Sequence, residues 1–110
     1  MGSRYLRPIP KRLLPDDMLV WPAVGDGTFE QPRLVENVRF EMTDEVVDDA
    51  HRSERVVGKV FVDAVNSRGA FEVPAGSRVL IGSLPSMFVR SCKRCRVIRS
   101  QIHHWELEVG

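Results

Sequence analysis

The residues best suited to chemistry in this chain are two cysteines and two neighbouring histidines near its end. Cys92 and Cys95 form a CxxC pair, and His103 and His104 follow it. A structural zinc ion usually takes four ligands, from two such pairs or from one pair followed by spaced histidines. Adjacent histidines on a strand point to opposite faces, so one ion would not receive both. We interpret the pair as reduced cysteines on a strand, with zinc bound through Cys92 and Cys95 as an alternative.

The other patterns typical of catalysis are missing from the sequence. It contains no Gly-x-Ser-x-Gly motif for an exposed nucleophile. The Gly-Asp-Gly at residues 25–27 lacks the third glycine and the following helix of a phosphate-binding loop. Paired carboxylates occur only in a polar stretch where nothing would desolvate them. His103, on the same strand face as Trp105, is interpreted as a packed histidine, and we expect neither an enzyme nor a cofactor.

A basic run is the next candidate site, although the net charge of the chain is only +1. Clusters of this kind contact phosphates. The run lacks the aromatic residues that stack single-stranded bases. It is interpreted as a solvated strand end, a nucleic-acid-binding surface, or a patch facing the acidic residues of a neighbouring copy. Its five positive charges are Arg90, Lys93, Arg94, Arg96 and Arg99.

The elements that position these residues are predicted to be strands. Alternation of apolar and polar residues, broken by Gly, Pro and Asn turns, predicts an all-β fold, a small β-barrel or sandwich. With 110 residues the chain is long enough for one domain. No apolar run approaches the roughly 20 residues that span a bilayer, so we expect no membrane contact. The expected strands are residues 17–21, 34–42, 58–65, 78–82, 87–93 and 102–109.

Residues 43–57 break this alternation and are predicted to form one long charged loop. A helical turn is expected around residues 45–50. Connections of this length within a compact domain are usually functional or disordered. The charged residues of this loop are Asp44, Glu45, Asp48, Asp49, His51, Arg52, Glu54 and Arg55.

The start of the chain is rich in proline and is predicted to be a stiff, extended arm. Three prolines fall within residues 8–15. Proline fixes φ and offers no N–H, so the segment cannot be a regular helix or a central strand. The arm would present Ile9, Leu13 and Leu14 to its own barrel or to a neighbouring subunit. We therefore divide the chain into an arm, residues 1–16, and a single barrel domain, residues 17–110.

Four places in the sequence carry a resemblance to a known family. They are the arm at residues 8–15, Asn-Val-Arg at 37–39, Phe-Val-Asp-Ala-Val-Asn-Ser at 61–67, and His-His-Trp-Glu-Leu at 103–107. In this order, over nearly the full length, the chain resembles the minor capsid or head-completion proteins of tailed bacteriophages. The resemblance implies a structural virion protein in the neck, assembled in the host bacterial cytoplasm.

More specifically, the resemblance implies a stopper-like ring of twelve copies in the head-tail connector. A portal or adaptor protein would lie above the ring, tail proteins below it, and packaged double-stranded DNA in its channel. Asp44, Glu45, Asp48, Asp49, His51 and Arg52 would then line the channel or meet the next ring. We expect subunit or partner contacts at Pro8, Ile9, Pro10, Arg12, Leu13, Leu14, Arg90, Arg94 and Arg96.

Overall fold

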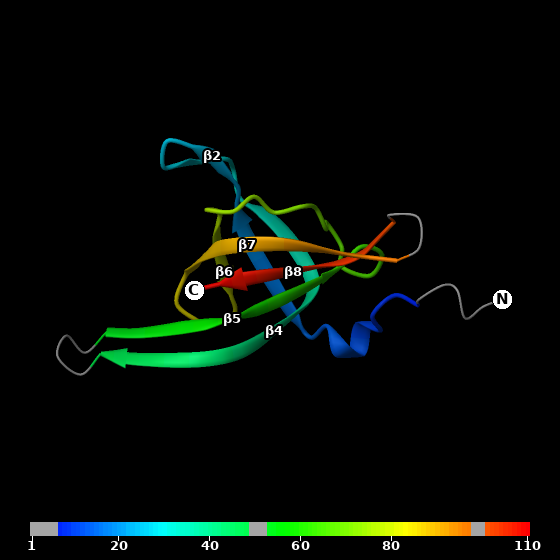
Figure 1. The fold of residues 1–110 in the computed structure, drawn as a ribbon, viewed down its shortest axis with the longest axis horizontal. Helices are drawn as coiled ribbons and strands as arrows, with labels where there is room; N and C mark the ends of the chain where they lie inside the picture. The colour runs from blue at the N-terminus through cyan, green and yellow to red at the C-terminus, as the bar shows by residue number, and fades with distance from the viewer. Residues whose placement is uncertain (1–6, 49–52, 98–100) are drawn as a thin grey trace.

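Six antiparallel strands close into a barrel, which confirms the all-β prediction (Figure 1). The computed structural model describes residues 7–48, 53–97 and 101–110. The barrel is closed because β6 pairs with β1 on one side and with β7 on the other. The strand order is β1 (Asp16–Trp21), β4 (Arg33–Asp48), β5 (Ser53–Asp63), β8 (Ile102–Val109), β7 (Met87–Arg96) and β6 (Arg78–Ile81).

Three further short elements lie within the described residues. The 3-10 turn η2 (Lys11–Leu13) precedes β1, and β2 (Ala23–Gly25) pairs with β3 (Thr28–Phe29) as a separate hairpin. The chain turns at residues 25–27, with positive φ at Gly25, Asp26 and Gly27. No helix in the described part of the chain is both long enough and apolar enough to cross a membrane.

The core forms as alternation predicts, since one face of each strand turns inward. In β8, Trp105, Leu107 and Val109 are buried, and in β5 Val60 and Val62 are buried. Burying apolar surface contributes about 25 cal/mol per Å², so this inward face supplies most of the drive to fold. Further buried residues come from β1, β4, β6, β7 and the β5–β6 connection: Met18, Val20, Val35, Val38, Val73, Val79, Ile81, Met87 and Val89.

Strand β4 departs from the strict alternation predicted for residues 34–42. Val35 and Val38 are both fully buried although they lie three positions apart. Asn37 has φ +58°, and the register between β1 and β4 shifts there. A bulge of this kind inserts one residue and reverses the facing of those beyond it. Met42 is 50% exposed because β4 by then has passed the end of the barrel.

The predicted loop at residues 43–57 is instead strand at residues 43–48 and 53–57. The helical turn expected around residues 45–50 is therefore wrong for residues 45–48, and residues 49 and 50 lie outside the described residues. β4 and β5 stay paired from Met42 and Gly58 out to Asp48 and Ser53. β8 ends opposite Gly58, so this part of the hairpin has left the barrel. Figure 1 shows it projecting away from the barrel. We call the described residues 43–48 and 53–57 the ribbon.

The ribbon leaves the barrel where Gly58 of β5 packs closely against the backbone of β4. A register shift lies between Met42 and Asp44, and a bulge increases strand twist. Opposite it, a Cβ at Gly58 would overlap the carbonyl oxygen of Glu41 and the ring of Phe40. Only glycine fits there without displacing backbone atoms, so Gly58 sets the base of the ribbon.

Candidate interaction surfaces

The N-terminal arm docks on one end of its own barrel. The Ile9 N–H donates to Asp63 Oδ1 at 2.9 Å, and Asn66 Nδ2 donates to the Ile9 carbonyl at 2.8 Å. His103 Nε2 lies 2.7 Å from the carbonyl oxygen of Arg7. Leu14, at the end of the arm, is fully buried. These contacts fix residues 7–14 against the turn after β5 and the start of β8.

A buried carboxylate organises this end of the barrel. Asp63 is fully buried, and its Oδ2 accepts from the backbone N–H groups of Val65 at 3.0 Å and Asn66 at 2.7 Å. The Asp63 N–H donates in turn to Ser67 Oγ at 2.8 Å, and that hydroxyl donates to the Asn37 carbonyl. Asp63 therefore shapes the turn and holds the arm with the same side chain. All four sequence places that carry the family resemblance meet here.

This docking revises what the arm was predicted to offer. The arm is not extended throughout, because residues 11–13 form the turn η2. The Leu14 side chain is fully buried within its own chain, so it cannot contact a neighbouring subunit in this conformation. The Leu14 carbonyl also accepts a hydrogen bond from Asn37 Nδ2 at 3.3 Å. Leu13 is 43% exposed. Pro8, Pro10 and Arg12 are also exposed, so contact between the arm and a neighbour remains a prediction for these residues.

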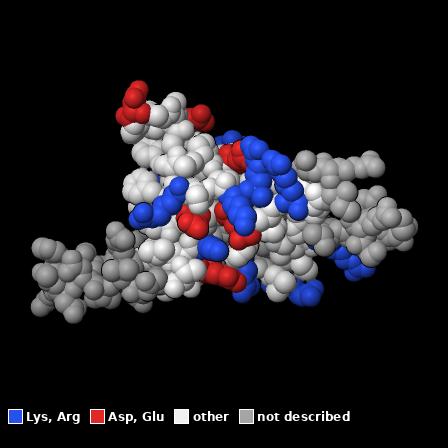
Figure 2. Space-filling model, viewed as in Figure 1, with Lys and Arg blue, Asp and Glu red and all other residues white. Residues whose placement is uncertain are grey.

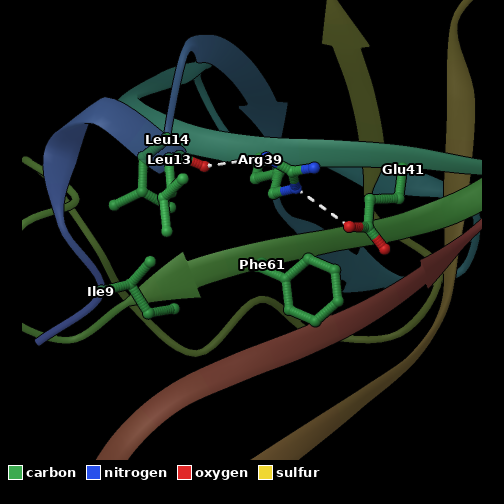
Figure 3. Close-up of a pocket in the computed structure, with 6 residues that line it drawn as sticks. All are labelled: Ile9, Leu13, Leu14, Arg39, Glu41 and Phe61. Carbon is green, nitrogen blue, oxygen red and sulfur yellow. Dashed lines mark hydrogen bonds and ion pairs between the residues drawn. The ribbon is translucent and has the colours of Figure 1, made fainter.

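A shallow pocket of about 320 Å³ lies between the arm and the sheet. Its apolar walls come from both sides, and an Arg39–Glu41 ion pair with a 2.9 Å Nε–Oε1 distance borders it. Figure 3 shows the apolar side chains of the arm facing the ring of Phe61. The lining residues are Ile9, Leu13, Leu14, Arg39, Glu41 and Phe61.

A second apolar surface was not predicted from the sequence. Phe29 and Phe88 stack with ring centroids 6.5 Å apart and are 41% and 49% exposed. A depression of about 490 Å³ beside them is lined by Trp21, Phe29 and Pro32 among others. The signal that could have found it is an aromatic residue, Phe29, two positions after the glycine turn at residues 25–27.

The acidic residues predicted to line a channel belong to the ribbon in part. Asp44, Glu45 and Asp48 lie on β4. Asp49, His51 and Arg52 lie outside the described residues. The structure thus moves the described acidic positions from a loop onto paired strands beyond the barrel.

The basic run lies on β7, and one of its arginines is already paired within the chain. Arg94 makes a two-point contact with Glu72, in which Nη2 and Oε2 are 2.6 Å apart. The hydrogen bonds from Arg94 lower the pKa of Glu72 to about 2. Arg90 and Arg96 are exposed, and Arg99 lies outside the described residues. Figure 2 shows Lys and Arg side chains interleaved with Asp and Glu rather than gathered alone.

The two cysteines do not share one site. Residues three apart on a strand face opposite ways, and here Cys92 packs against the core while Cys95 pairs with His104 across β7 and β8. The predicted alternative of zinc held by both cysteines is therefore wrong. His103 Nδ1 and His104 Nδ1 are nevertheless 2.8 Å apart, so the adjacent histidines are not separated as expected.

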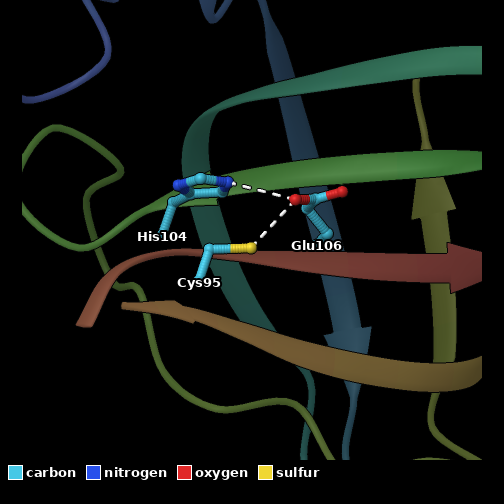
Figure 4. A group of neighbouring side chains, drawn as sticks. All are labelled: Cys95, His104 and Glu106. Atoms are coloured by element: carbon cyan, nitrogen blue, oxygen red, sulfur yellow. Dashed lines mark hydrogen bonds and ion pairs between the residues drawn. The ribbon is translucent and has the colours of Figure 1, made fainter. Parts of the chain in front are cut away.

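Cys95 belongs to a different cluster, which the sequence did not indicate. Its Sγ donates to Glu106 Oε2 at 2.9 Å, and His104 Nε2 lies 3.4 Å from the same oxygen. Figure 4 shows the three side chains converging on one side of the sheet. Burial and the neighbouring carboxylate raise the pKa of the Cys95 thiol to about 11. The residues come from β7 and β8, whose register no local pattern reveals.

These observations define a small closed barrel that offers contact surfaces: a docked arm, a projecting ribbon and exposed aromatic residues. Residues 10–109 match a family model described as minor capsid protein. Because the match covers nearly the whole sequence, the chain belongs to this family and is a phage minor capsid protein. The family is structural, and it implies a location in the virion. Searches of curated proteins and of solved structures found no match.

Proposed function

We propose that this minor capsid protein is a ring-forming component of the head-tail connector. In this proposal twelve copies lie between the portal or adaptor protein and the tail, and the ring helps to retain packaged DNA. The role is structural, and it needs no chemistry from the chain. Copies would join through surfaces that a single barrel leaves open.

The ribbon is the observation that carries the proposal. In the ribbon, residues 44–48 pair with residues 53–57, and no third described strand covers either edge. A two-stranded hairpin alone is marginally stable in water. Its outer edges carry unpaired N–H and C=O groups that readily accept another strand. A second copy or a neighbouring ring would supply that strand.

Exposed apolar side chains support the same reading at two other places. Leu13 borders the arm pocket on one side of the barrel, and Phe29 and Phe88 form an aromatic pair elsewhere. Two separate apolar patches on one small domain suit head-to-tail association, in which each copy uses different surfaces toward its two neighbours. Such contacts close into a ring when the rotation between copies allows.

The sequence of the ribbon suits a position near the channel. Asp44, Glu45 and Asp48 are negatively charged at neutral pH, as is the DNA backbone. Like charges repel, so an acidic hairpin would let DNA pass without gripping it. This placement agrees with a channel or inter-ring role for residues 44–52.

A shortened ribbon tests the proposal. Replacing residues 46–55 with Asn-Gly keeps the Glu45–Val56 pair and closes the hairpin with a two-residue turn. We expect the variant to fold, as judged by circular dichroism, but to yield heads that lack tails and lose DNA. Electron microscopy of particles assembled with the variant provides the readout.

The matched control keeps the ribbon and removes its charge, as Asp44→Asn, Glu45→Gln and Asp48→Asn together. If strand addition is the main contact, this control should still join heads to tails. Micrographs of the intact particle should also place the protein in the neck and give its copy number. Normal tails on particles with the shortened ribbon, or a location on the outer capsid lattice, would overturn the proposal.

The rival proposal of a nucleic-acid-binding barrel rests on residues 90–99. Arg94, in the middle of this segment, already forms an ion pair with Glu72, so it is less available to bind a phosphate. It predicts binding to duplex DNA that falls steeply with salt and is lost in Arg90→Ala with Arg96→Ala. Measuring DNA affinity of the purified chain at two salt concentrations separates it from a purely structural role.

A further inference from the structure

The cluster of Cys95, His104 and Glu106 has the composition and the spacing of a metal site. Its sulfur, nitrogen and oxygen donor atoms all lie within 4.8 Å of one another. Zinc binds such ligands at about 2.0–2.3 Å, which in a tetrahedral site places donors about 3.3–3.8 Å apart. The nitrogen–oxygen separation of 3.4 Å falls within that spacing, and the sulfur–oxygen separation of 2.9 Å is shorter, as expected for a thiol hydrogen-bonded to the carboxylate in the absence of an ion. Small side-chain rotations would admit an ion.

The neighbouring histidine fixes how His104 presents its ring. His103 Nε2 faces the Arg7 carbonyl, which can only accept, so that nitrogen carries the proton. His103 Nδ1 is then an acceptor, and His104 Nδ1 must donate to it across 2.8 Å. Histidines that bind metals commonly donate their other ring N–H in this way, which sets the tautomer and orients the ligand.

This arrangement leaves His104 Nε2 directed at a carboxylate. A neutral His104 that donates through Nδ1 has a lone pair on Nε2, and Glu106 Oε2 lies 3.4 Å away. Two electron-rich atoms facing each other require a proton or a cation between them. Glu106 Oε2 also accepts from the Cys95 thiol, so a cation that replaces the thiol proton would be shared by all three donor atoms; Lys59 Nζ lies 4.0 Å from the other carboxylate oxygen, Oε1.

We propose that Cys95 Sγ, His104 Nε2 and Glu106 Oε2 bind one zinc ion, which joins β7 to β8 beside the docked arm. On binding, the Cys95 thiol releases its proton to solvent and the sulfur–zinc bond forms. The mixed set of thiolate, imidazole and carboxylate is one that zinc accepts, with water in the fourth position. His103 is a positioning residue that links the ion to the arm through Arg7.

Cobalt provides a direct optical test, because Co²⁺ replaces Zn²⁺ and reports a thiolate ligand by a near-ultraviolet charge-transfer band. The full chain, freed of metal by a chelator, is titrated with Co²⁺. We expect one equivalent to bind with that band, and Zn²⁺ to displace it. We also expect Zn²⁺ to raise the melting temperature of the protein, since a ligand that binds only the folded state stabilises it.

Two cysteine variants form a matched pair. Cys95→Ser should abolish the charge-transfer band, whereas Cys92→Ser, on the other face of the same strand, should leave both band and affinity unchanged. Glu106→Gln should lower affinity more than about tenfold, since loss of outer partners alone costs about 10–100-fold. His103→Phe should keep the band while weakening affinity about tenfold or more.

Several results would overturn the proposal. They are the absence of a thiolate band, binding that survives Cys95→Ser unchanged, or a band lost in Cys92→Ser but kept in Cys95→Ser. Circular dichroism of the metal-free variants confirms that each is folded. The outcome is independent of where the protein lies in the virion.

Discussion

At the scale of single residues, Asp63 has the largest structural role. Its carboxylate accepts from three backbone N–H groups, those of Ile9, Val65 and Asn66. It thereby joins the turn after β5 to a segment 54 positions earlier in the chain. The three hydrogen bonds are part-buried and converge on one fully buried acceptor, so this side chain stabilises more than a single exposed hydrogen bond does.

Asp63→Ala is therefore expected to lower the free energy of unfolding by about 1–3 kcal/mol, since three part-buried donors lose their shared acceptor. Urea unfolding monitored by circular dichroism measures the change. Asp17→Ala is the control, because Asp17 is exposed and accepts from one backbone N–H, that of Asn37. Equal losses in the two variants would contradict the role assigned to Asp63.

Glu72 makes the stability of the folded state depend on pH in the acidic range. Its pKa in the folded protein, about 2, lies below the usual 4.5, mainly because Arg94 donates to it. A lowered pKa stabilises the folded state above pH 4.5, and that contribution is lost as pH falls from 4.5 toward 2. Glu72→Gln should thus be less stable than the unmodified protein at pH 7, with the difference shrinking below pH 4.5.

Urea unfolding at pH 7, 4 and 3 tests this convergence. Arg94→Gln should behave like Glu72→Gln, because it removes the partner that lowers the pKa. Both side chains are more than 40% exposed, so added salt should reduce the difference at pH 7. A stability difference that stays constant from pH 7 to pH 3 would contradict the pairing.

Residue-scale sites were the hardest to predict from sequence. The CxxC spacing drew attention to Cys92 and Cys95, yet the strand separates them and unites Cys95 with His104 and Glu106. That union depends on the register between β7 and β8, which is set by the whole barrel. Arg94 and Glu72 are likewise 22 positions apart, with no pattern between them.

At the scale of elements, alternation predicted well wherever a strand faces the core. Strand β8 was predicted at its observed bounds, and its inward face was correct. Residues 43–57 were predicted to be a loop because their sequence is dense in charged residues, although Val56, at the base of the ribbon, is buried in the core. The sequence left open whether the arm contacts its own barrel or a neighbouring subunit. Its prolines predict a stiff segment, but they do not indicate which surface that segment binds.

Two adjacent leucines allow the docking of the arm on its own barrel and its proposed contact with a neighbour to be tested separately. Leu14 is fully buried, whereas Leu13 is 43% exposed beside the arm pocket. Leu14→Ala should lower the free energy of unfolding by about 2–5 kcal/mol, as for other buried leucines. Leu13→Asp should lower stability less than Leu14→Ala does, because Leu13 is partly exposed, but should reduce assembly.

Thermal unfolding gives the first quantity, and the fraction of particles with tails gives the second. This pair improves on deleting the whole arm, which would remove Leu14 and the contacts of Ile9 along with the exposed residues. Normal assembly by a stable Leu13→Asp variant would show that the arm serves its own barrel only.

At the scale of the whole molecule, opposite charges lie on different parts of the chain. Arg90, Lys93 and Arg96 are exposed on β7, and the sequence of the ribbon contains Asp44, Glu45 and Asp48. In a head-to-tail ring each copy would present its ribbon to the β7 surface of the next. Complementary patches of this kind steer association and set which surfaces meet.

Reversing both patches in one chain tests this arrangement. Arg90→Glu with Arg96→Glu should abolish assembly, because two acidic surfaces would then meet, and Asp44→Lys with Glu45→Lys should do the same. Combining all four changes should restore it, since every interface in the ring is again complementary. The measurement is the fraction of particles with tails, with ring size followed by light scattering. Assembly by either two-site variant at the level of the unmodified protein would exclude this contact, because repulsion across each interface would then have no effect on closure.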